Sequence, residues 1–182
     1  MDKFQEQFAI PKLNKHQIRI GLTGGIASGK STVAKFLEDS MQLPILDADI
    51  YSHEVLSTNL FLRDNLIERY GNQITQKKLT SEKSIDRKIL AKIIFEDKEE
   101  RFWLESKLHP IIKRRFLEEI NTHTKSPILI LVIPLLFEAN FTDICTHTWL
   151  VHCRLHQQEK RLMKRDSLSK KEALQRIKSQ ID

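Results

Sequence analysis

Residues 18–32 have the sequence IRIGLTGGIASGKST, and this stretch decides the fold. The apolar run Ile18–Leu22 ends at a glycine-rich turn and predicts a buried strand. From Lys30 to Asp39 the apolar residues have helical spacing. Residues 24–31 fit the pattern G-x-x-x-x-G-K-[ST] between this strand and this helix, which is the context that a phosphate-binding loop requires.

The chemistry of such a loop comes mainly from its backbone. Glycines permit positive φ, so successive N–H groups can point inward at an anion, and the helix N-terminus adds positive potential. Lys30 would reach the β- and γ-phosphates, and the Ser31 hydroxyl would ligate Mg²⁺. A glycine-rich turn with a stray lysine is the alternative, but we expect a nucleoside triphosphate to bind through Gly24, Gly25, Ala27, Ser28, Gly29, Lys30, Ser31 and Thr32.

Three further apolar runs predict strands at residues 43–46, 128–133 and 148–153. Continuous apolar strands that alternate with helices indicate an α/β fold with a parallel sheet covered on both faces. The connection from Leu46 to Ile128 is far longer than one crossover helix needs, so we expect it to contain an inserted helical subdomain.

Composition narrows the class of protein. The 182 residues suit one domain with a small insertion, and the net charge is +6. The segment Arg154–Lys178 holds nine basic and three acidic residues, so it carries the whole net positive charge of the chain. Such a basic helical segment indicates either an anionic partner or a solvated helix face. The longest apolar stretch is too short for a membrane span. Two cysteines, Cys145 and Cys153, make no disulfide framework, so we expect a reduced, cytoplasmic protein with both thiols in its core.

A second acidic site accompanies the loop. Ligands of open α/β sheets gather at the carboxyl ends of the strands, which predicts one cleft around Thr23–Ser31, Asp47–Asp49 and Pro134–Glu138. Because the strand that ends at Pro134 carries no terminal Asp, the acid near the γ-phosphate must come from Asp47-Ala48-Asp49. A carboxylate there could accept a proton from an attacking hydroxyl or hold Mg²⁺ through water; in the alternative, Asp49 only caps a helix that starts at Ile50.

The sequence resembles the dephospho-coenzyme A kinase family from about Arg19 to its end. The resemblance is carried by the phosphate loop and five further motifs, namely Asp47-Ala48-Asp49, Ile85-Asp86-Arg87, His109-Pro110, Pro134-Leu135-Leu136-Phe137-Glu138 and Gln158…Arg161…Arg165-Asp166. The loop alone is generic, whereas the Asp-Ala-Asp turn, the His-Pro pair and the Pro-Leu-Leu-Phe-Glu strand end, in this order, are specific.

The resemblance implies a P-loop kinase-type three-layer fold and an enzyme that uses ATP and Mg²⁺ to phosphorylate the ribose 3′-hydroxyl of dephospho-coenzyme A, the last step of coenzyme A synthesis. It also implies the domain organisation. After an arm at 1–16, we expect a nucleotide core at 17–50 and 123–153, a helical coenzyme A-binding subdomain at 51–122, a lid at 154–169 and a C-terminal helix to residue 182.

The resemblance, together with the residue chemistry, assigns roles in this sequence. The expected catalytic residues are Asp49 as general base, Lys30 and Arg165; Arg161 and Arg165, four apart on one helix face, join the ATP site. The expected substrate-binding residues are Asp49, His109, Pro134, Leu135 and Glu138. In the alternative, the two arginines pair on the surface with Glu159 and Asp166. We expect His109 before Pro110 to shape a helix break rather than to carry out proton chemistry. Phe102 and Trp103 are expected in the core of the insertion.

Other functions remain open at this stage. The chain could be another P-loop nucleoside or nucleotide kinase, or a P-loop ATPase stimulated by nucleic acid. The sequence lacks an aromatic-rich basic groove, so we expect no nucleic-acid and no membrane partner. Family members continue beyond the point at which this sequence ends, with another strand; we therefore expect an open sheet edge that favours self-association, unless the arm 1–16 covers it.

Overall fold

The computed structural model describes residues 13–77, 83–178 and 180 of the chain. The backbone divides into two compact units: the first contains the chain up to Ala48 and from Leu117 onward, and the second contains Asp49–Phe116. The boundaries expected from the sequence, near residues 50 and 123, lie a few residues away. The roles assigned to the parts of the chain stay predictions.

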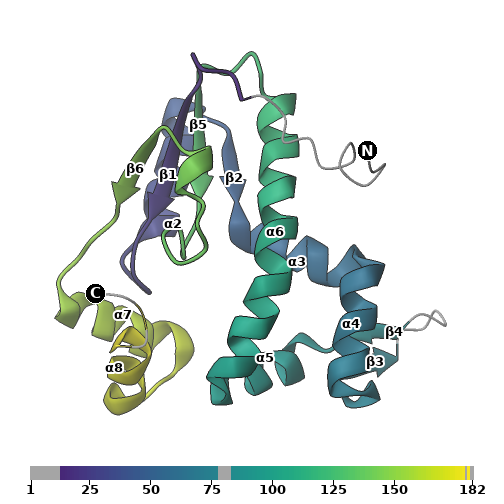
Figure 1. The fold of residues 1–182 in the computed structure, drawn as a ribbon. Coiled ribbons are helices and arrows are strands. Elements are labelled where there is room, and N and C mark those ends of the chain that lie inside the picture. The colour runs from purple at the N-terminus through teal and green to yellow at the C-terminus, as the bar shows by residue number, and fades with distance from the viewer. Residues whose placement is uncertain (1–12, 78–82, 179, 181–182) are drawn as a thin grey trace, which may run out of the picture. The chain divides into compact units, whose positions relative to one another are not determined.

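A four-stranded parallel sheet forms the centre of the first unit (Figure 1). In the order β2-β5-β1-β6, the strands are β2 (Ile45–Asp47), β5 (Ile128–Val132), β1 (Ile18–Thr23) and β6 (His147–Leu150). Every neighbouring pair is parallel, which confirms the predicted α/β class. The bounds of two strands differ from the prediction, because β2 begins two residues later and β6 ends at Leu150 rather than Cys153.

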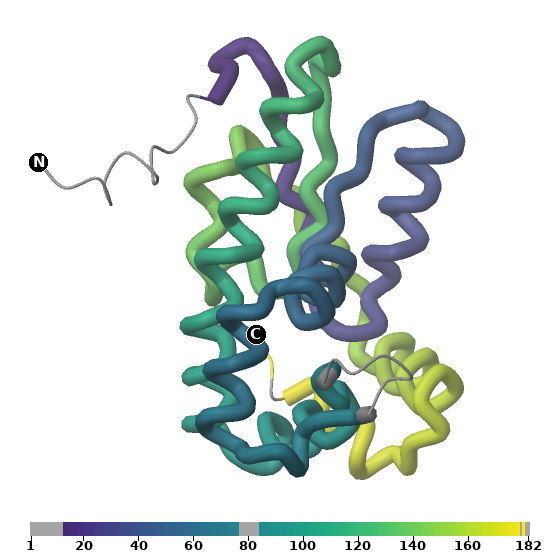
Figure 2. The backbone as a smooth tube through the Cα atoms, turned by 90° about the vertical axis from the view of Figure 1, so that its right-hand side faces the viewer, coloured from purple at the N-terminus to yellow at the C-terminus, as the bar shows by residue number. Residues whose placement is uncertain are grey.

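Helix α2 (Lys30–Met41) packs against this sheet, as Figures 1 and 2 both show. Its buried side chains Ala34 and Leu37 join a cluster with the strand residues Ile20, Leu22, Ile130 and Val132. Burying one such branched side chain stabilises the fold by roughly 1.5–3 kcal/mol. The cluster therefore fixes the start of α2 against the end of β1, and the loop between them is anchored on both sides.

The register of the sheet brings three strand ends to one edge. Leu22 of β1 pairs with Val132 of β5, and Val132 pairs in turn with Asp47 of β2. In a parallel sheet all carboxyl ends face the same way, so Asp47 and the turns after β1 and β5 lie along one edge. This edge is where the sequence predicted the cleft.

The second unit is mainly helical, as expected for the insertion. Its elements are α3 (Ala48–Thr58), α4 (Leu60–Tyr70), the 3₁₀ turn η1 (Asn72–Ile74), strands β3 (Thr75–Lys77) and β4 (Lys83–Ile85), α5 (Arg87–Glu96) and α6 (Lys98–Thr122), whose last turns belong to the first unit. The antiparallel β3–β4 hairpin was not predicted. Asn59 and Asp86 cap α4 and α5 by accepting hydrogen bonds from the backbone N–H groups of Leu62 and Lys88, at 2.8 and 2.9 Å.

The helix break expected at His109-Pro110 is wrong. Helix α6 continues through Pro110, although a proline removes one hydrogen bond and costs about 3 kcal/mol in a helix interior. Leu104, Leu108, Ile112 and Phe116 are all buried at a spacing of four along this helix, on both sides of the proline. Four such burials, each worth roughly 1.5–3 kcal/mol, outweigh the cost of the proline.

The expected burial of Phe102 is also wrong, because 62% of this residue is exposed. The buried stripe of α6 passes through Leu104 and Leu108, and Phe102 lies off that stripe. Trp103 is half-buried, and the Arg69 guanidinium lies 4.4 Å from its ring centroid. Cys145 and Cys153 are half-buried free thiols rather than fully buried ones; burial raises the pKa of Cys145 to about 11.

Two basic helices follow the sheet. Helices α7 (Leu155–Asp166) and α8 (Lys170–Lys178) contact each other and form the yellow-green hairpin of Figure 2. A short 3₁₀ turn η2 (Thr142–Ile144) precedes β6. Within the described ranges, no helix combines the length and the apolar character that crossing a membrane demands.

Candidate active site

The loop between β1 and α2 has the backbone that an anion site needs. Gly24, Ala27 and Gly29 have positive φ, at 156°, 57° and 108°. A tight turn closes the loop, in which the N–H of Ser28 donates to the carbonyl of Gly25 at 3.1 Å. Because Gly29 is the N-cap of α2, the first N–H groups of the helix open toward the loop.

Two side chains of the loop are informative. Ser28 is 5% exposed, and its Oγ is buried without a hydrogen-bond partner among the described residues. A buried hydroxyl without a partner is costly, so this atom fits a site whose ligand supplies the missing acceptor or donor. Lys30 is half-buried in the first turn of α2, and Ser31 and Thr32 beside it are exposed. A lysine and hydroxyl side chains at these loop positions suit a phosphate chain with its metal ion.

Helix α7 holds the loop from outside. The Gln158 side-chain amide donates to the carbonyl of Ile26 at 3.1 Å. Arg161 Nη1 donates to the carbonyls of Ser28 at 3.0 Å and Ala27 at 3.4 Å. The loop can therefore turn its N–H groups inward while its carbonyl oxygens are bound by α7.

Gln180 contacts the same loop from the far end of the chain. Its Oε1 accepts a hydrogen bond from the N–H of Ile26 at 2.6 Å.

The alternative in which Arg161 pairs with Glu159 on the surface is excluded. Glu159 forms its ion pair with Lys170, at 3.4 Å, and Arg161 contacts the loop instead. Whether Arg161 also binds ATP stays a prediction.

Arg165, by contrast, forms the ion pair that the alternative reading expected. It holds both oxygens of Asp166, at 2.7 and 3.1 Å, and Arg176 of α8 binds the same carboxylate at 2.9 Å. The hydrogen bonds from Arg165 lower the pKa of Asp166, and the carboxylate raises the pKa of Arg165 in return. The contact between Arg176 and Asp166 ties the end of α7 to α8, and the catalytic role of Arg165 stays a prediction.

The two acidic residues of the Asp-Ala-Asp turn lie in different elements. Asp47 is the last residue of β2 and belongs to the sheet edge described above. Asp49 is the second residue of α3 and begins the second unit. It is therefore not the cap of a helix that starts at Ile50, and that alternative is wrong. Its predicted role as general base is not tested by this placement.

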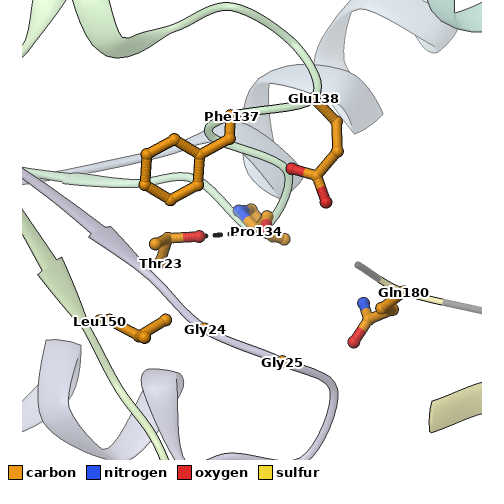
Figure 3. A pocket seen from close by; sticks show the side chains of 8 residues that line it. All are labelled: Thr23, Gly24, Gly25, Pro134, Phe137, Glu138, Leu150 and Gln180. Carbon is orange, nitrogen blue, oxygen red and sulfur yellow. Dashed lines mark hydrogen bonds between the residues drawn. The ribbon is translucent and has the colours of Figure 1, made fainter. Parts of the chain in front are cut away.

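A cavity of about 170 Å³ adjoins the phosphate loop within the first unit (Figure 3). Its wall contains the loop residues Gly24 and Gly25, and two predicted substrate-binding residues, Pro134 and Glu138. The other lining residues are Thr23, Phe137, Leu150 and Gln180. Leu135, also predicted, is half-buried and does not line it.

His109 lies in α6 within the second unit and is half-buried. Burial lowers its pKa, and the neighbouring Glu105 opposes this shift. A histidine with a lowered pKa is neutral at physiological pH and can donate or accept a hydrogen bond. Its predicted contact with substrate stays untested.

Comparison with known proteins decides the family. The family model for dephospho-CoA kinase matches residues 18–182. The chain belongs to the dephospho-CoA kinase family. A dephospho-CoA kinase of Prochlorococcus marinus is 50% identical over 173 residues, which are 95% of this chain and 82% of that protein. Another, from a Synechococcus species, is 49% identical over 90% of this chain and 80% of its own length.

Solved structures agree with the dephospho-CoA kinase assignment. A crystal structure from Thermus thermophilus superposes with a TM-score of 0.75 at 34% identity, covering 92% of this chain and 82% of the other. The dephospho-CoA kinase of Campylobacter jejuni superposes with a TM-score of 0.63 at 32% identity, covering 90% of this chain and 80% of the other. The predicted P-loop kinase-type fold is confirmed by these relatives.

The sequence reasoning missed several residues around the loop of this dephospho-CoA kinase family member. Gln158 was not expected to touch the loop, although it shares a helix face with Arg161 and Arg165 at spacings of three and four. That spacing was a usable signal. Phe137 and Leu150 line the cavity because β5 and β6 end there, and Gln180 reaches the loop from the end of the chain; local pattern carries no signal for these contacts.

Proposed function

We propose that this chain transfers the terminal phosphoryl group of ATP to the ribose 3′-hydroxyl of dephospho-coenzyme A, the last step of coenzyme A biosynthesis. The observation that supports it most is the phosphate loop of this dephospho-CoA kinase family member: a strand–loop–helix nest in which the buried Ser28 hydroxyl has no hydrogen-bond partner within the described part of the chain. The cavity beside Gly24 and Gly25 supports the proposal, because an acceptor bound there would lie beside the phosphate loop.

ATP would bind through the residues predicted from the sequence. The N–H groups of the loop and of the first turn of α2 would bind the phosphates, and Lys30 would neutralise the β- and γ-phosphates. Ser31 would be a direct ligand of Mg²⁺, with Asp47 or Asp49 acting through water. The metal, when bound, neutralises charge on the β- and γ-oxygens; the set of a hydroxyl, phosphates and waters suits magnesium.

The transfer itself needs a base and a cation from the chain. The 3′-oxygen forms a bond to the γ-phosphorus while the bond from that phosphorus to the β–γ bridging oxygen breaks, so ADP leaves. The hydroxyl proton goes to Asp49, which we assign as general base. Arg165 and Arg161 would offset the charge spread over the transferring oxygens. Arg165 would then exchange its Asp166 partner for phosphate.

Five residues are predicted from the sequence to bind the acceptor. Pro134 and Glu138 line the cavity beside the loop, which supports their predicted role. His109 and Leu135 lie outside that cavity, and we retain them only as predicted contacts for other parts of dephospho-coenzyme A. We further infer a reduced, cytoplasmic enzyme, since both cysteines are free thiols. We expect no nucleic-acid or membrane partner, and gel filtration tests the expected self-association.

One assay tests the proposed function. The purified chain is given ATP, Mg²⁺ and dephospho-coenzyme A, and the product is identified by mass and by the position of its new phosphate. Coenzyme A carrying a 3′-phosphate is the expected product. Nucleosides and nucleotides serve as competing acceptors, and their preferential phosphorylation would assign the chain to another P-loop kinase class. ATP hydrolysis that rises only when nucleic acid is added would contradict the proposal altogether.

A further inference from the structure

The cavity beside the phosphate loop has a distinctive wall. The Phe137 ring, Leu150 and Pro134 form apolar surface, and the backbone of Gly24 and Gly25 forms the side toward the loop (Figure 3). At about 170 Å³ it is smaller than the roughly 300–1,000 Å³ of a pocket for a drug-sized ligand. It therefore suits one sugar ring or a similar fragment rather than a whole nucleotide.

Glu138 carries the only charge among the described residues that line this cavity. Figure 3 shows its carboxylate directed toward the space between Pro134 and Gln180. No hydrogen bond or ion pair joins that carboxylate to another described residue. An ionised carboxylate only accepts hydrogen bonds and repels phosphate oxygens. Glu138 is exposed, and its carboxylate would bind a neutral hydrogen-bond donor or a cation in the cavity rather than a phosphate oxygen. The groups of dephospho-coenzyme A that fit this requirement are its neutral donors.

We propose that Glu138 binds the 2′-hydroxyl of the acceptor ribose and so directs the 3′-hydroxyl toward the transferred phosphoryl group; this inference rests on the proposed function. The 2′-hydroxyl is a neutral donor on the carbon next to the one that reacts. A molecule in this cavity would lie against Gly24 and Gly25 of the phosphate loop, and so beside the phosphates that the loop is proposed to bind. Holding one hydroxyl of the vicinal pair decides which of the two is phosphorylated.

The acceptor has other donors, but they are worse placed. The adenine amino group lies on the side of the base away from the ribose 3′-hydroxyl, and the amides of the pantetheine arm are separated from the ribose by the pyrophosphate. The 2′-hydroxyl is the donor closest to the reacting oxygen. A carboxylate that binds a ribose 2′-hydroxyl is also the device by which dinucleotide-binding folds read this group.

The experiment is a double-mutant cycle between protein and substrate. Parent, Glu138→Gln and Glu138→Ala are each assayed with dephospho-coenzyme A and with its 2′-deoxyribose analogue. Loss of one hydrogen bond to a charged group corresponds to about 10–150-fold in kcat/KM, so we expect that loss for the parent on the deoxy analogue and for Glu138→Ala on the natural acceptor. Glu138→Ala assayed on the 2′-deoxy analogue should lose little more kcat/KM than either change causes alone, because both remove the same hydrogen bond.

Product regiochemistry supplies a readout that a structural role of Glu138 would not affect. We expect the parent to form the 3′-phosphate, and Glu138→Ala to form a measurable share of the 2′-phosphate from the natural acceptor. Glu38→Gln is the matched control: it removes the same charge from an exposed position on α2, away from the cavity, and should behave as the parent. Glu138→Gln, which keeps the side-chain size, retains the test if the alanine variant does not fold.

The outcomes separate this inference from the function on which it rests. If the parent does not phosphorylate dephospho-coenzyme A, the proposed function fails and this inference fails with it. If the parent is active but the losses from Glu138→Ala and from the deoxy analogue multiply, and the product stays 3′-phosphorylated, only the role of Glu138 is overturned. The role of Glu138 is also overturned if Glu138→Ala no longer lowers kcat/KM for an acceptor that lacks the adenine amino group. That result would mean that the cavity holds the base rather than the ribose.

Discussion

Gly24 is the position at which the geometry of the phosphate loop can be tested most directly. A Cβ atom placed on Gly24 would lie 2.3 Å from the backbone carbonyl oxygen of Val151 and 2.9 Å from Ser28 Oγ. The Val151 backbone cannot easily give way, because its N–H donates to the carbonyl of Thr23 at 2.8 Å at the end of β1. Gly24→Ala must therefore move the loop away from the neighbouring strand end.

The size of the effect follows from that distance. Contacts of a real Cβ begin near 3.0–3.4 Å, so the loop and the Val151 oxygen must separate by about 1 Å. Overpacking of this kind typically costs about 1–3 kcal/mol, which lowers Tm by about 2–12 °C in a chain of this size. A displacement of about 1 Å at a catalytic site can cost about 10²-fold in rate. We therefore expect Gly24→Ala to lose about 10²-fold in kcat/KM for ATP and to melt earlier.

Two other glycines provide matched controls. Gly25→Ala meets the end of the Gln158 side chain at 2.8 Å, and this flexible side chain can move, so we expect much smaller losses. Gly71→Ala meets nothing within 4 Å but has φ at 74°, so it should lower Tm and leave the affinity for ATP unchanged. Calorimetry and steady-state kinetics on the three variants give the answer. Activity of Gly24→Ala within a few-fold of the parent, or equal damage from Gly25→Ala, would refute the steric reasoning.

The remaining predictions concern the base, the lid and acid stability. Asp49→Asn should lower kcat by about 10²–10⁴-fold with the Kd for ATP preserved, because it removes only the proton acceptor; if Asp47→Asn is the crippling change instead, the assignment within the turn is wrong. Arg165→Ala should lower kcat more than it weakens ATP binding, since its phosphate contact would form on closure; an effect on ATP affinity alone would make it a ground-state binder. Hydrogen bonds from Arg69 and Tyr70 lower the pKa of Glu100 to about 2 from its ordinary 4.5, so its stabilising contribution is complete above about pH 4.5 and is lost as the pH falls toward 2. Glu100→Gln should therefore flatten the fall of Tm over that acid range, and an unchanged profile would contradict it.

The sequence predicted the sheet and the loop because both are set by local pattern. The apolar run at Ile128–Ile133 appears as β5, and α2 begins at Lys30, directly after the last glycine of the loop. Neither result needs knowledge of distant contacts. A buried parallel strand is apolar throughout, and a glycine with positive φ defines the N-terminus of the helix.

The errors arise where tertiary burial overrides a local rule. Pro110 is a strong helix breaker by itself, but the buried residues on either side of it hold α6 together. The β3–β4 hairpin has strands of only three residues, Thr75–Lys77 and Lys83–Ile85, whose polar composition resembles that of a loop. In both cases the deciding interactions come from other elements, and periodicity along the chain does not report them.

The candidate site shows the same division at the level of side chains. Motif spacing placed Gly24 in the loop and Lys30 at the start of the following helix, and the structure has both residues at these positions. It assigned Arg161 to phosphate and did not anticipate the carbonyl oxygens of Ala27 and Ser28 as its partners. That difference depends on how α7 packs against the loop, which follows from the complete fold of the first unit and not from the segment itself.

The contacts of Arg161 also link the position of α7 to the state of the phosphate loop. Arg161 is exposed and donates to loop carbonyls, contacts whose net contribution at such a site is on the order of 1 kcal/mol. A charge-assisted hydrogen bond to phosphate is roughly twice as strong as a neutral one. If Arg161 turns to the phosphates as proposed, binding of ATP loosens the hold of α7 on Ala27 and Ser28. By linkage, a change such as Gln158→Ala that weakens the resting contact should favour the ATP-bound position of the helix. Under this proposal the same helix would hold the loop through Gln158 and Arg161 and would supply arginines to bound ATP, so exchange between the two arrangements would set how far α7 acts as the predicted lid.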